Sequence, residues 1–262
     1  MTAYRQSIFS KSIIWLAAAT SLLMFTWPLF ISSGIQNEAI LAQSVFIALM
    51  PVMLALILSE YASGGIGSRQ LALLGVLTAL NAVIRMLGAG TGGVETAFFL
   101  IIIGAYVFGS GFGFILGATS LLVSALLTGG VGPWLPFQMM AAALIGLGAG
   151  ALPKFSGQSP RRKSLELATL AGYGILGSFV YGALMTLWNW PYLAGAGSSV
   201  SYLAGAGPVE NLTRFIQYEV LTGGLLWDLG RAVTTTVLIY LTAPALLATL
   251  RRAASRAGFE KL

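Results

Sequence analysis

Long, uninterrupted apolar runs alternate along the chain with short breaks rich in charged residues, glycine, proline or serine. Because about 20 helical residues cross a hydrocarbon core about 30 Å thick, such runs are typical of membrane-spanning helices. The runs lie near residues 12–33, 40–60, 70–88, 94–110, 112–129, 134–152, 165–187 and 220–249. The pattern predicts an all-α integral membrane protein of about eight transmembrane helices, with its longest external connection near 188–219.

Composition supports this prediction and narrows the chemistry. Hydrophobic residues make up 57% of the 262 positions and charged residues only 8%, against about a quarter charged in soluble domains. The chain has no cysteine and no histidine, which removes the usual ligands of zinc and all imidazole acid–base catalysis. We therefore expect no metal, no cofactor and no enzymatic activity, since an intramembrane enzyme would also need a cluster of catalytic groups.

The basic residues are distributed unequally between the two sides of the membrane. With the amino terminus in the cytoplasm, eleven of the fourteen fall inside, and only Arg85, Arg214 and Arg231 fall outside. This asymmetry is what the positive-inside rule describes. It predicts a multi-pass protein of the cytoplasmic (inner) membrane with both termini in the cytoplasm, and it explains the net charge of +6 without nucleic acid.

Small residues recur at intervals of three or four in several predicted helices. Such stripes allow close approach of two helices in lipid. Each stripe has two interpretations: packing inside the bundle or docking of a partner membrane subunit. The stripes are Gly109, Gly113 and Gly117; Ala142, Gly146 and Gly150; and Ala72, Gly75, Ala79 and Ala82.

Three predicted external segments hold most of the unusual residues. The glycine-rich segment 85–95 ends in Glu95, which we expect to pair with Arg85, and it lacks the Lys-Ser/Thr ending of a phosphate-binding loop. Aromatic and amide side chains occupy the other two segments, where they suit either anchoring at the membrane interface or contact with a ligand. These side chains are Trp134, Phe137 and Gln138 in one segment and Trp188, Asn189 and Trp190 in the other.

The last predicted helix contains two ionisable residues close to its start. Asp228 and Arg231 are three residues apart and so share one helix face. Ionisable groups at membrane depth usually face a bundle interior or a watery cavity. They form either an internal pair or a direct contact with a ligand.

The central part of the chain resembles a known family. The run Gly104-Ala-Tyr-Val-Phe-Gly-Ser-Gly-Phe-Gly-Phe-Ile-Leu-Gly117, the segment Gly132-Pro-Trp-Leu-Pro-Phe-Gln-Met139 and the run Gly146-Leu-Gly-Ala-Gly-Ala-Leu-Pro153 carry the resemblance. Together they resemble the substrate-binding S components of energy-coupling factor (ECF) vitamin transporters, over roughly residues 70 to 250.

The resemblance implies that this chain binds the substrate and that other subunits supply the energy for import. An S component is a six-helix bundle that captures a vitamin or related micronutrient from outside, while a coupling membrane protein and two ATPases drive import. It also implies that the stripe Ala72, Gly75, Ala79 and Ala82 docks on the coupling protein. The chain would then consist of two extra amino-terminal helices in residues 1–64 and a six-helix substrate-binding core in 65–262.

Our hypothesis is a substrate-specific membrane subunit with a vitamin-like ligand, of which a cobalamin-like molecule is the first candidate. The alternative is an independent secondary transporter in which the pair Asp228 and Arg231 couples a small organic solute to an ion or proton. The expected substrate-binding residues are Glu95, Trp134, Phe137, Gln138, Trp188, Asn189, Trp190 and Arg231.

Overall fold

The computed structural model describes residues 8–30, 68–88, 91–132, 134–155, 159–193, 198–203 and 205–257, and within these ranges it contains helices and no strand. The all-α prediction is confirmed. The predicted helix at 40–60 lies outside the described residues. The helices are α1 (Ile8–Phe30), α3 (Ser68–Gly88), the 3-10 turn η2 (Thr91–Gly93), α4 (Phe98–Phe108), α5 (Ser110–Thr128), α6 (Leu135–Gly150), α7 (Pro160–Leu187), α8 (Trp190–Leu193), α9 (Pro208–Leu221) and α10 (Gly224–Ala257).

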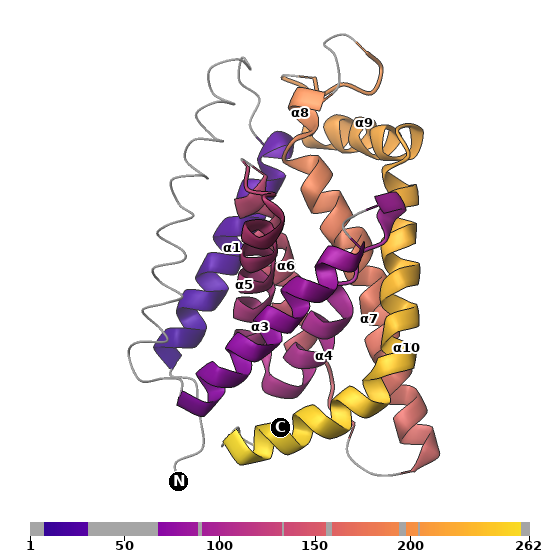
Figure 1. The fold of residues 1–262 in the computed structure, drawn as a ribbon. Helices are drawn as coiled ribbons and strands as arrows, with labels where there is room; N and C mark the ends of the chain where they lie inside the picture. Colours follow the sequence, from indigo (N-terminus) through magenta and orange to yellow (C-terminus); the bar gives the residue numbers. More distant parts are fainter. Residues whose placement is uncertain are drawn as a thin grey trace.

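The long helices run lengthwise through the bundle, and α9 lies across one end of it (Figure 1). Among the described residues, four helices are long and apolar enough to cross a membrane: α3, α5, α7 and α10. The apolar part of α1 and the helices α4 and α6 are shorter. Helix α4 has eleven residues, ten of them buried, and it contacts α3, α5, α6, α7 and α10, which makes it the centre of the bundle.

Local sequence explains where the helices begin and end. Ser159 caps α7 by accepting a hydrogen bond from the Arg162 backbone N–H, and Pro160 occupies the first turn, where its missing N–H costs nothing. Gly129 ends α5 in the left-handed conformation (φ 68°), which glycine adopts without strain. Pro244 lies inside α10, and Figure 1 shows the end of this helix turned beneath α3, as expected from proline kinks.

The segment 188–219, predicted to be an external connection, holds most of the helix α9, which ends at Leu221. Its buried residues Asn211, Phe215 and Glu219 are four apart, so they share one helix face. Val209, Ile216 and Val220 on its other faces are exposed and apolar. This sidedness is that of a helix lying at a membrane interface.

Helices α5 and α6 touch through their backbones. A Cβ on Gly113 would overlap the Gly146 carbonyl, and one on Gly117 would overlap the Ala142 carbonyl. A Cβ on Gly150 would likewise overlap the backbone of Ser110. The packing interpretation of these two stripes is confirmed.

Candidate functional site

A buried ion pair joins α3 to the segment that precedes α4. The Nε of Arg85 lies 3.4 Å from Oε2 of Glu95, and the Ala97 backbone N–H donates to Oε1 of Glu95 at 3.1 Å. The Arg85 guanidinium also donates to the Ser124 hydroxyl of α5 at 3.1 Å. The expected pairing of Glu95 with Arg85 is confirmed, and it holds three parts of the chain together.

A second buried ion pair lies at the start of α10. Arg231 pairs with Asp228 and donates to the Ser178 carbonyl of α7 at 3.3 Å. Helix α7 can come this close because Gly182 has no side chain: a Cβ there would overlap the Asp228 carboxylate. The expected internal pair is therefore present, and it holds α7 and α10 together.

Tyr181 of α7 lies beside the second ion pair. The Arg231 guanidinium carbon lies 5.0 Å from the centre of its ring, within the range of a cation–π contact. We call Arg85, Glu95, Tyr181, Asp228 and Arg231 the polar cluster.

The turn η2 lies directly on the first turns of α10. A Cβ on Gly93 would be 2.5 Å from the Trp227 carbonyl oxygen, and one on Gly230 would be 2.8 Å from the Gly92 carbonyl oxygen. The glycine-rich sequence therefore serves close backbone approach. This contact brings Glu95 to the same end of the bundle as Arg231.

Several buried polar atoms in this half of the bundle have no hydrogen-bond partner among the residues that the structure describes. A buried polar group left unpaired costs about 1–3 kcal/mol, so such atoms are candidates for contact with a ligand. They include Nε of Arg231, both amide atoms of Asn81, Nε1 of Trp188 and Oε1 of Glu219.

Glu219 reaches this region from α9. Its side chain is buried, and a Cβ on Gly224 would overlap its carboxylate. Burial raises the pKa of the Glu219 carboxyl above its usual range, because removal from water penalises the charged form.

The aromatic residues expected to contact a ligand are mostly packed inside the protein. The rings of Phe137 and Trp188 stack with centres 3.6 Å apart at 8°. Trp190 is fully buried, donates to the Val200 carbonyl at 3.0 Å and contacts Phe215. Trp134 is different, since 47% of it is exposed.

Thus the structure brings Glu95 and Arg231 into the polar cluster and stacks Phe137 on Trp188. The amides of Gln138 and Asn189 are half-buried. Ligand contact by Trp134, Phe137, Gln138, Trp188, Asn189 and Trp190 stays a prediction. Sequence reasoning missed Tyr181 and Asn81, although a polar residue inside an apolar run is a usable signal.

The stripe expected to dock a partner is open along most of its length. Ala72, Gly75 and Ala79 are exposed, and a Cβ on Gly75 would meet nothing within 4 Å. Ala82 is fully buried and so does not belong to this exposed surface. Unlike the stripes of α5 and α6, the exposed part of this one has no described helix against it.

A separate cluster closes the opposite end of the bundle. The buried Glu166 of α7 pairs with Arg251 of α10 and accepts a hydrogen bond from the Tyr106 hydroxyl of α4 at 2.7 Å. Lys154 lies 4.0 Å above the Tyr106 ring. Burial, with repulsion from Arg251, lowers the pKa of Lys154 to about 8.

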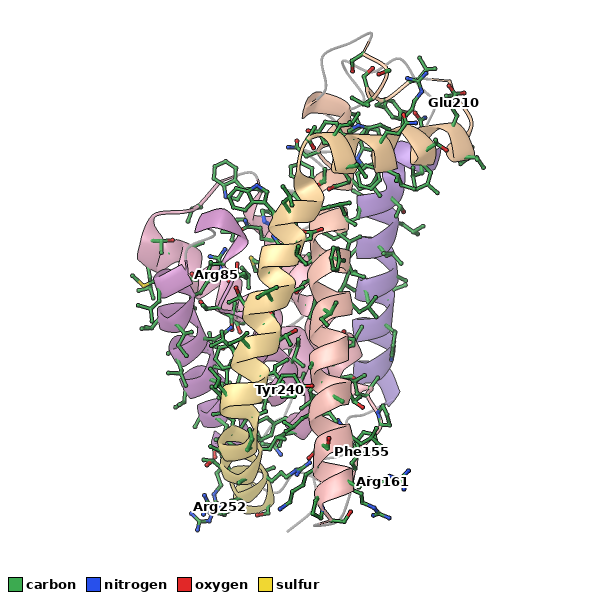
Figure 2. The ribbon with its side chains drawn as sticks, turned by 90° about the vertical axis from the view of Figure 1, so that its right-hand side faces the viewer. Arg85, Phe155, Arg161, Glu210, Tyr240 and Arg252 are labelled. Carbon is green, nitrogen blue, oxygen red and sulfur yellow. The ribbon has the colours of Figure 1, made fainter. Side chains whose placement is uncertain are left out.

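Charges thus mark the two ends of the molecule. Figure 2 shows Arg161 and Arg252 at one end, which we call the basic end, and Arg85 and Glu210 toward the other. No group of three or more Asp or Glu side chains that could hold a metal occurs in the part of the chain that the structure describes.

A multi-pass helical membrane protein with a buried charged cluster toward one end is the class that this fold and site define. The family model of the ECF transporter substrate-specific component matches residues 69–254. The chain belongs to this family and is therefore a substrate-binding transport subunit of the membrane. No curated protein and no solved structure is significantly similar to it.

Proposed function

We propose that this protein binds a vitamin or related micronutrient from outside the cell and delivers it for import driven by a separate ATP-hydrolysing module. The observation that carries the proposal is the polar cluster: two buried ion pairs and a tyrosine in a chain of the S-component family. Ionisable groups at membrane depth usually mark a substrate path. The charged side chains of the polar cluster are therefore suited to a ligand that itself carries polar or charged groups.

The location of the polar cluster supports capture from outside. It lies toward the end opposite Arg161 and Arg252, and the positive-inside rule assigns arginine-rich ends to the cytoplasm. The protein would thus sit in the cytoplasmic membrane with its carboxyl terminus inside. Asp228 pairs with Arg231 and Glu95 with Arg85, which keeps both guanidinium groups oriented. The buried Nε of Arg231 has no hydrogen-bond partner in the described part of the chain, so it could donate to an acceptor on a bound ligand.

The partners would be a coupling membrane protein and two ATPase subunits. The exposed residues Ala72, Gly75 and Ala79 on α3 offer a flat surface on which a partner helix can pack closely. No phosphate-binding loop with a Lys-Ser/Thr ending is present in the sequence, which is consistent with ATP hydrolysis in another chain.

A binding titration tests the proposal. Purified protein in detergent, without ATP, is titrated with cobalamin, riboflavin, thiamine, biotin and folate by tryptophan fluorescence and calorimetry. We expect stoichiometric binding of one ligand. Failure of all five to bind, together with gradient-driven uptake of another solute by this chain alone, would establish the secondary transporter instead.

A matched pair of variants tests the polar cluster. Arg231→Gln is expected to weaken binding on the order of tenfold or more, because a charge-assisted hydrogen bond is lost. Arg214→Gln is the control, since its pair with Glu210 is exposed. Because Arg231→Gln leaves Asp228 buried and unpaired, the double variant Asp228→Asn/Arg231→Gln is measured as well; equal affinity of all variants would contradict the proposed site.

A further inference from the structure

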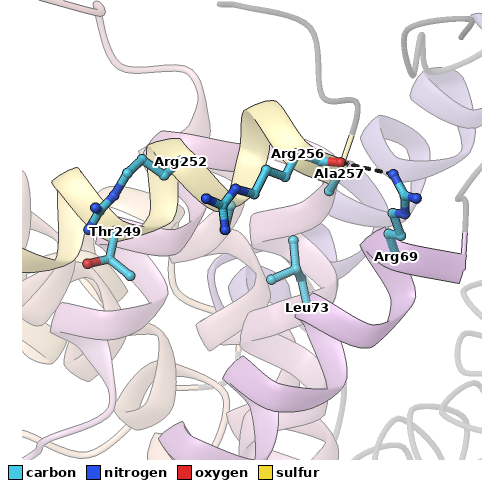
Figure 3. Close-up of a pocket in the computed structure, with 7 residues that line it drawn as sticks. Arg69, Leu73, Thr249, Arg252, Arg256 and Ala257 are labelled. Atoms are coloured by element: carbon cyan, nitrogen blue, oxygen red, sulfur yellow. Dashed lines mark hydrogen bonds between the residues drawn. The ribbon is translucent and has the colours of Figure 1, made fainter.

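A groove lies at the basic end, between the first turns of α3 and the last turns of α10. It has a volume of about 880 Å³ and is lined by Arg69, Leu73, Thr249, Arg252, Ala253, Arg256 and Ala257. Figure 3 shows the three arginines along this groove, with Leu73 below them. We call it the arginine groove. It is remote from the polar cluster, which lies toward the other end of the same helices.

The three arginines carry positive charge that the described residues do not neutralise. The ion pairs found in the described part of the chain use Arg85, Arg214, Arg231 and Arg251 instead. Within the described ranges, the side chains of two of these arginines donate to backbone oxygens: Arg69 to the Arg256 carbonyl at 3.3 Å and Arg252 to the Ala248 carbonyl at 3.2 Å.

These two bonds orient the side chains of Arg69 and Arg252 and leave most of their N–H donors unused. A guanidinium has five N–H donors, and each of these bonds uses one. The Arg69 bond also joins the start of α3 to the end of α10, across the groove. The remaining donors suit an anion with several oxygens, and arginine matches the geometry of phosphate.

Apart from Thr249, the rest of the groove is apolar and continues onto exposed apolar surface of α3. Leu73, Ala253 and Ala257 line it, and on α3 the neighbouring Leu71, Val76 and Leu80 are exposed. Helix α3 is one of the candidate membrane spans and begins at Ser68, which places Arg69 at the boundary between headgroups and hydrocarbon. A free phosphate ion would use the arginines but none of the apolar surface.

We propose that the arginine groove binds an anionic phospholipid, with its phosphate on Arg69, Arg252 and Arg256. Its acyl chains would lie along Leu73, Val76 and Leu80 of α3, to one side of the exposed small-residue stripe. Basic pockets between membrane helices are suited to such headgroups. The volume of the groove falls in the usual range of small-molecule sites, roughly 300–1,000 Å³. The bound lipid would join the start of α3 to the end of α10.

The test uses the full chain in detergent. Native mass spectrometry and thermal unfolding are measured with phosphatidylglycerol and with phosphatidylcholine of the same acyl chains, and with inorganic phosphate. The groove variant is Arg69→Gln/Arg252→Gln/Arg256→Gln. The control variant, Arg161→Gln/Arg162→Gln/Lys163→Gln, removes the same charge from exposed positions at the same end.

We expect wild type and control to prefer phosphatidylglycerol by on the order of tenfold or more, and the groove variant to lose this preference. Equal loss in the two triple variants would overturn the proposal in favour of general charge attraction. Stabilisation by inorganic phosphate equal to that by phosphatidylglycerol would overturn it in favour of a free-anion site.

Two further measurements cover a folding defect and a protein partner. If the groove variant does not fold, the single charge reversal Arg256→Glu, at an exposed position, must lower phosphatidylglycerol binding while leaving phosphatidylcholine binding unchanged. Failure of the groove variant to assemble with an ECF module, combined with an unchanged lipid preference, would identify the groove as a protein interface and overturn the proposal.

Discussion

Glycine acts in two different ways at the residue scale of this protein. Between α5 and α6, Gly113 and Gly146 allow two backbones to touch. On α7, by contrast, Gly172 is exposed and a Cβ there would meet nothing within 4 Å. A side chain would thus disturb the packing of the backbone at Gly113 or Gly146, whereas Gly172 has room for one.

Gly146→Ala and Gly172→Ala form a matched pair. The first should destabilise the protein by about 1–3 kcal/mol, because the new methyl group meets the Gly113 carbonyl. The second should leave stability unchanged or raise it slightly, because alanine favours the helix. Thermal unfolding followed by tryptophan fluorescence measures both, and equal stability of the two variants would contradict the backbone contact.

Lys154 makes stability depend on pH. Its pKa of about 8 in the folded protein lies below the ordinary 10.5, so between these values the unfolded chain binds the extra proton. Stability contributed by this group therefore rises as pH increases from 8 to 10.5, and the cost of burying its charge is fully present below the folded-state pKa.

The comparison of wild type with Lys154→Met isolates this effect. The unfolding temperature of wild type, relative to that of the variant, should rise between about pH 8 and about pH 10. A difference that stays constant over this interval would show that Lys154 does not titrate there.

At the scale of elements, the apolar runs predicted most of the helices to within a few residues. Helix α7 begins at Pro160, earlier than expected, because Ser159 and Pro160 start the helix while its first turns are still polar. Helix α9 was missed because its apolar residues recur with helical period in a segment too polar to span the membrane. The sequence signal for this helix was the distribution of apolar residues around the helix axis, and not the mean hydropathy of the segment.

The candidate site was predictable only in part. Charges are rare in such a chain, so Glu95, Arg85, Asp228 and Arg231 stood out and their pairing was correctly expected. Tyr181 and Asn81 did not stand out: Tyr181 matters through its contact with Arg231 on another helix, and Asn81 through the burial of an amide that has no hydrogen-bond partner among the described residues. Phe137, Trp188 and Trp190 were predicted to contact a ligand, but aromatic composition alone does not distinguish a ligand wall from a packed core.

The open stripe on α3 gives a prediction for a whole element. Gly75→Leu should leave ligand binding by the isolated chain unchanged, because the new side chain has space, yet it should reduce assembly with a coupling protein and ATP-driven uptake severalfold or more. Gly172→Leu on α7 is the control and should affect neither. Equal loss of assembly in both variants would contradict a specific docking face.

At the scale of the whole molecule, arginines gather at the basic end. This gives a prediction about which end of the protein faces the cytoplasm. Because the chain has no cysteine, single cysteines can be introduced at exposed serines at either end. In intact cells, Ser199→Cys should react with a membrane-impermeant maleimide, while Ser164→Cys at the basic end should react only after permeabilisation. The reverse pattern would show that the basic end faces outward.

The backbone contact between α5 and α6 also limits how the molecule can move. Two helices that touch through glycine carbonyls cannot slide past one another without steric overlap, so we expect this pair to stay together as a fixed wall. We therefore expect movement to involve other helices. Helices α7 and α10 are held together by two separate polar contacts, one centred on the Asp228 pair and one on Glu166. A carrier built in this way would open toward one side by breaking the contact at that end while the wall stays in place.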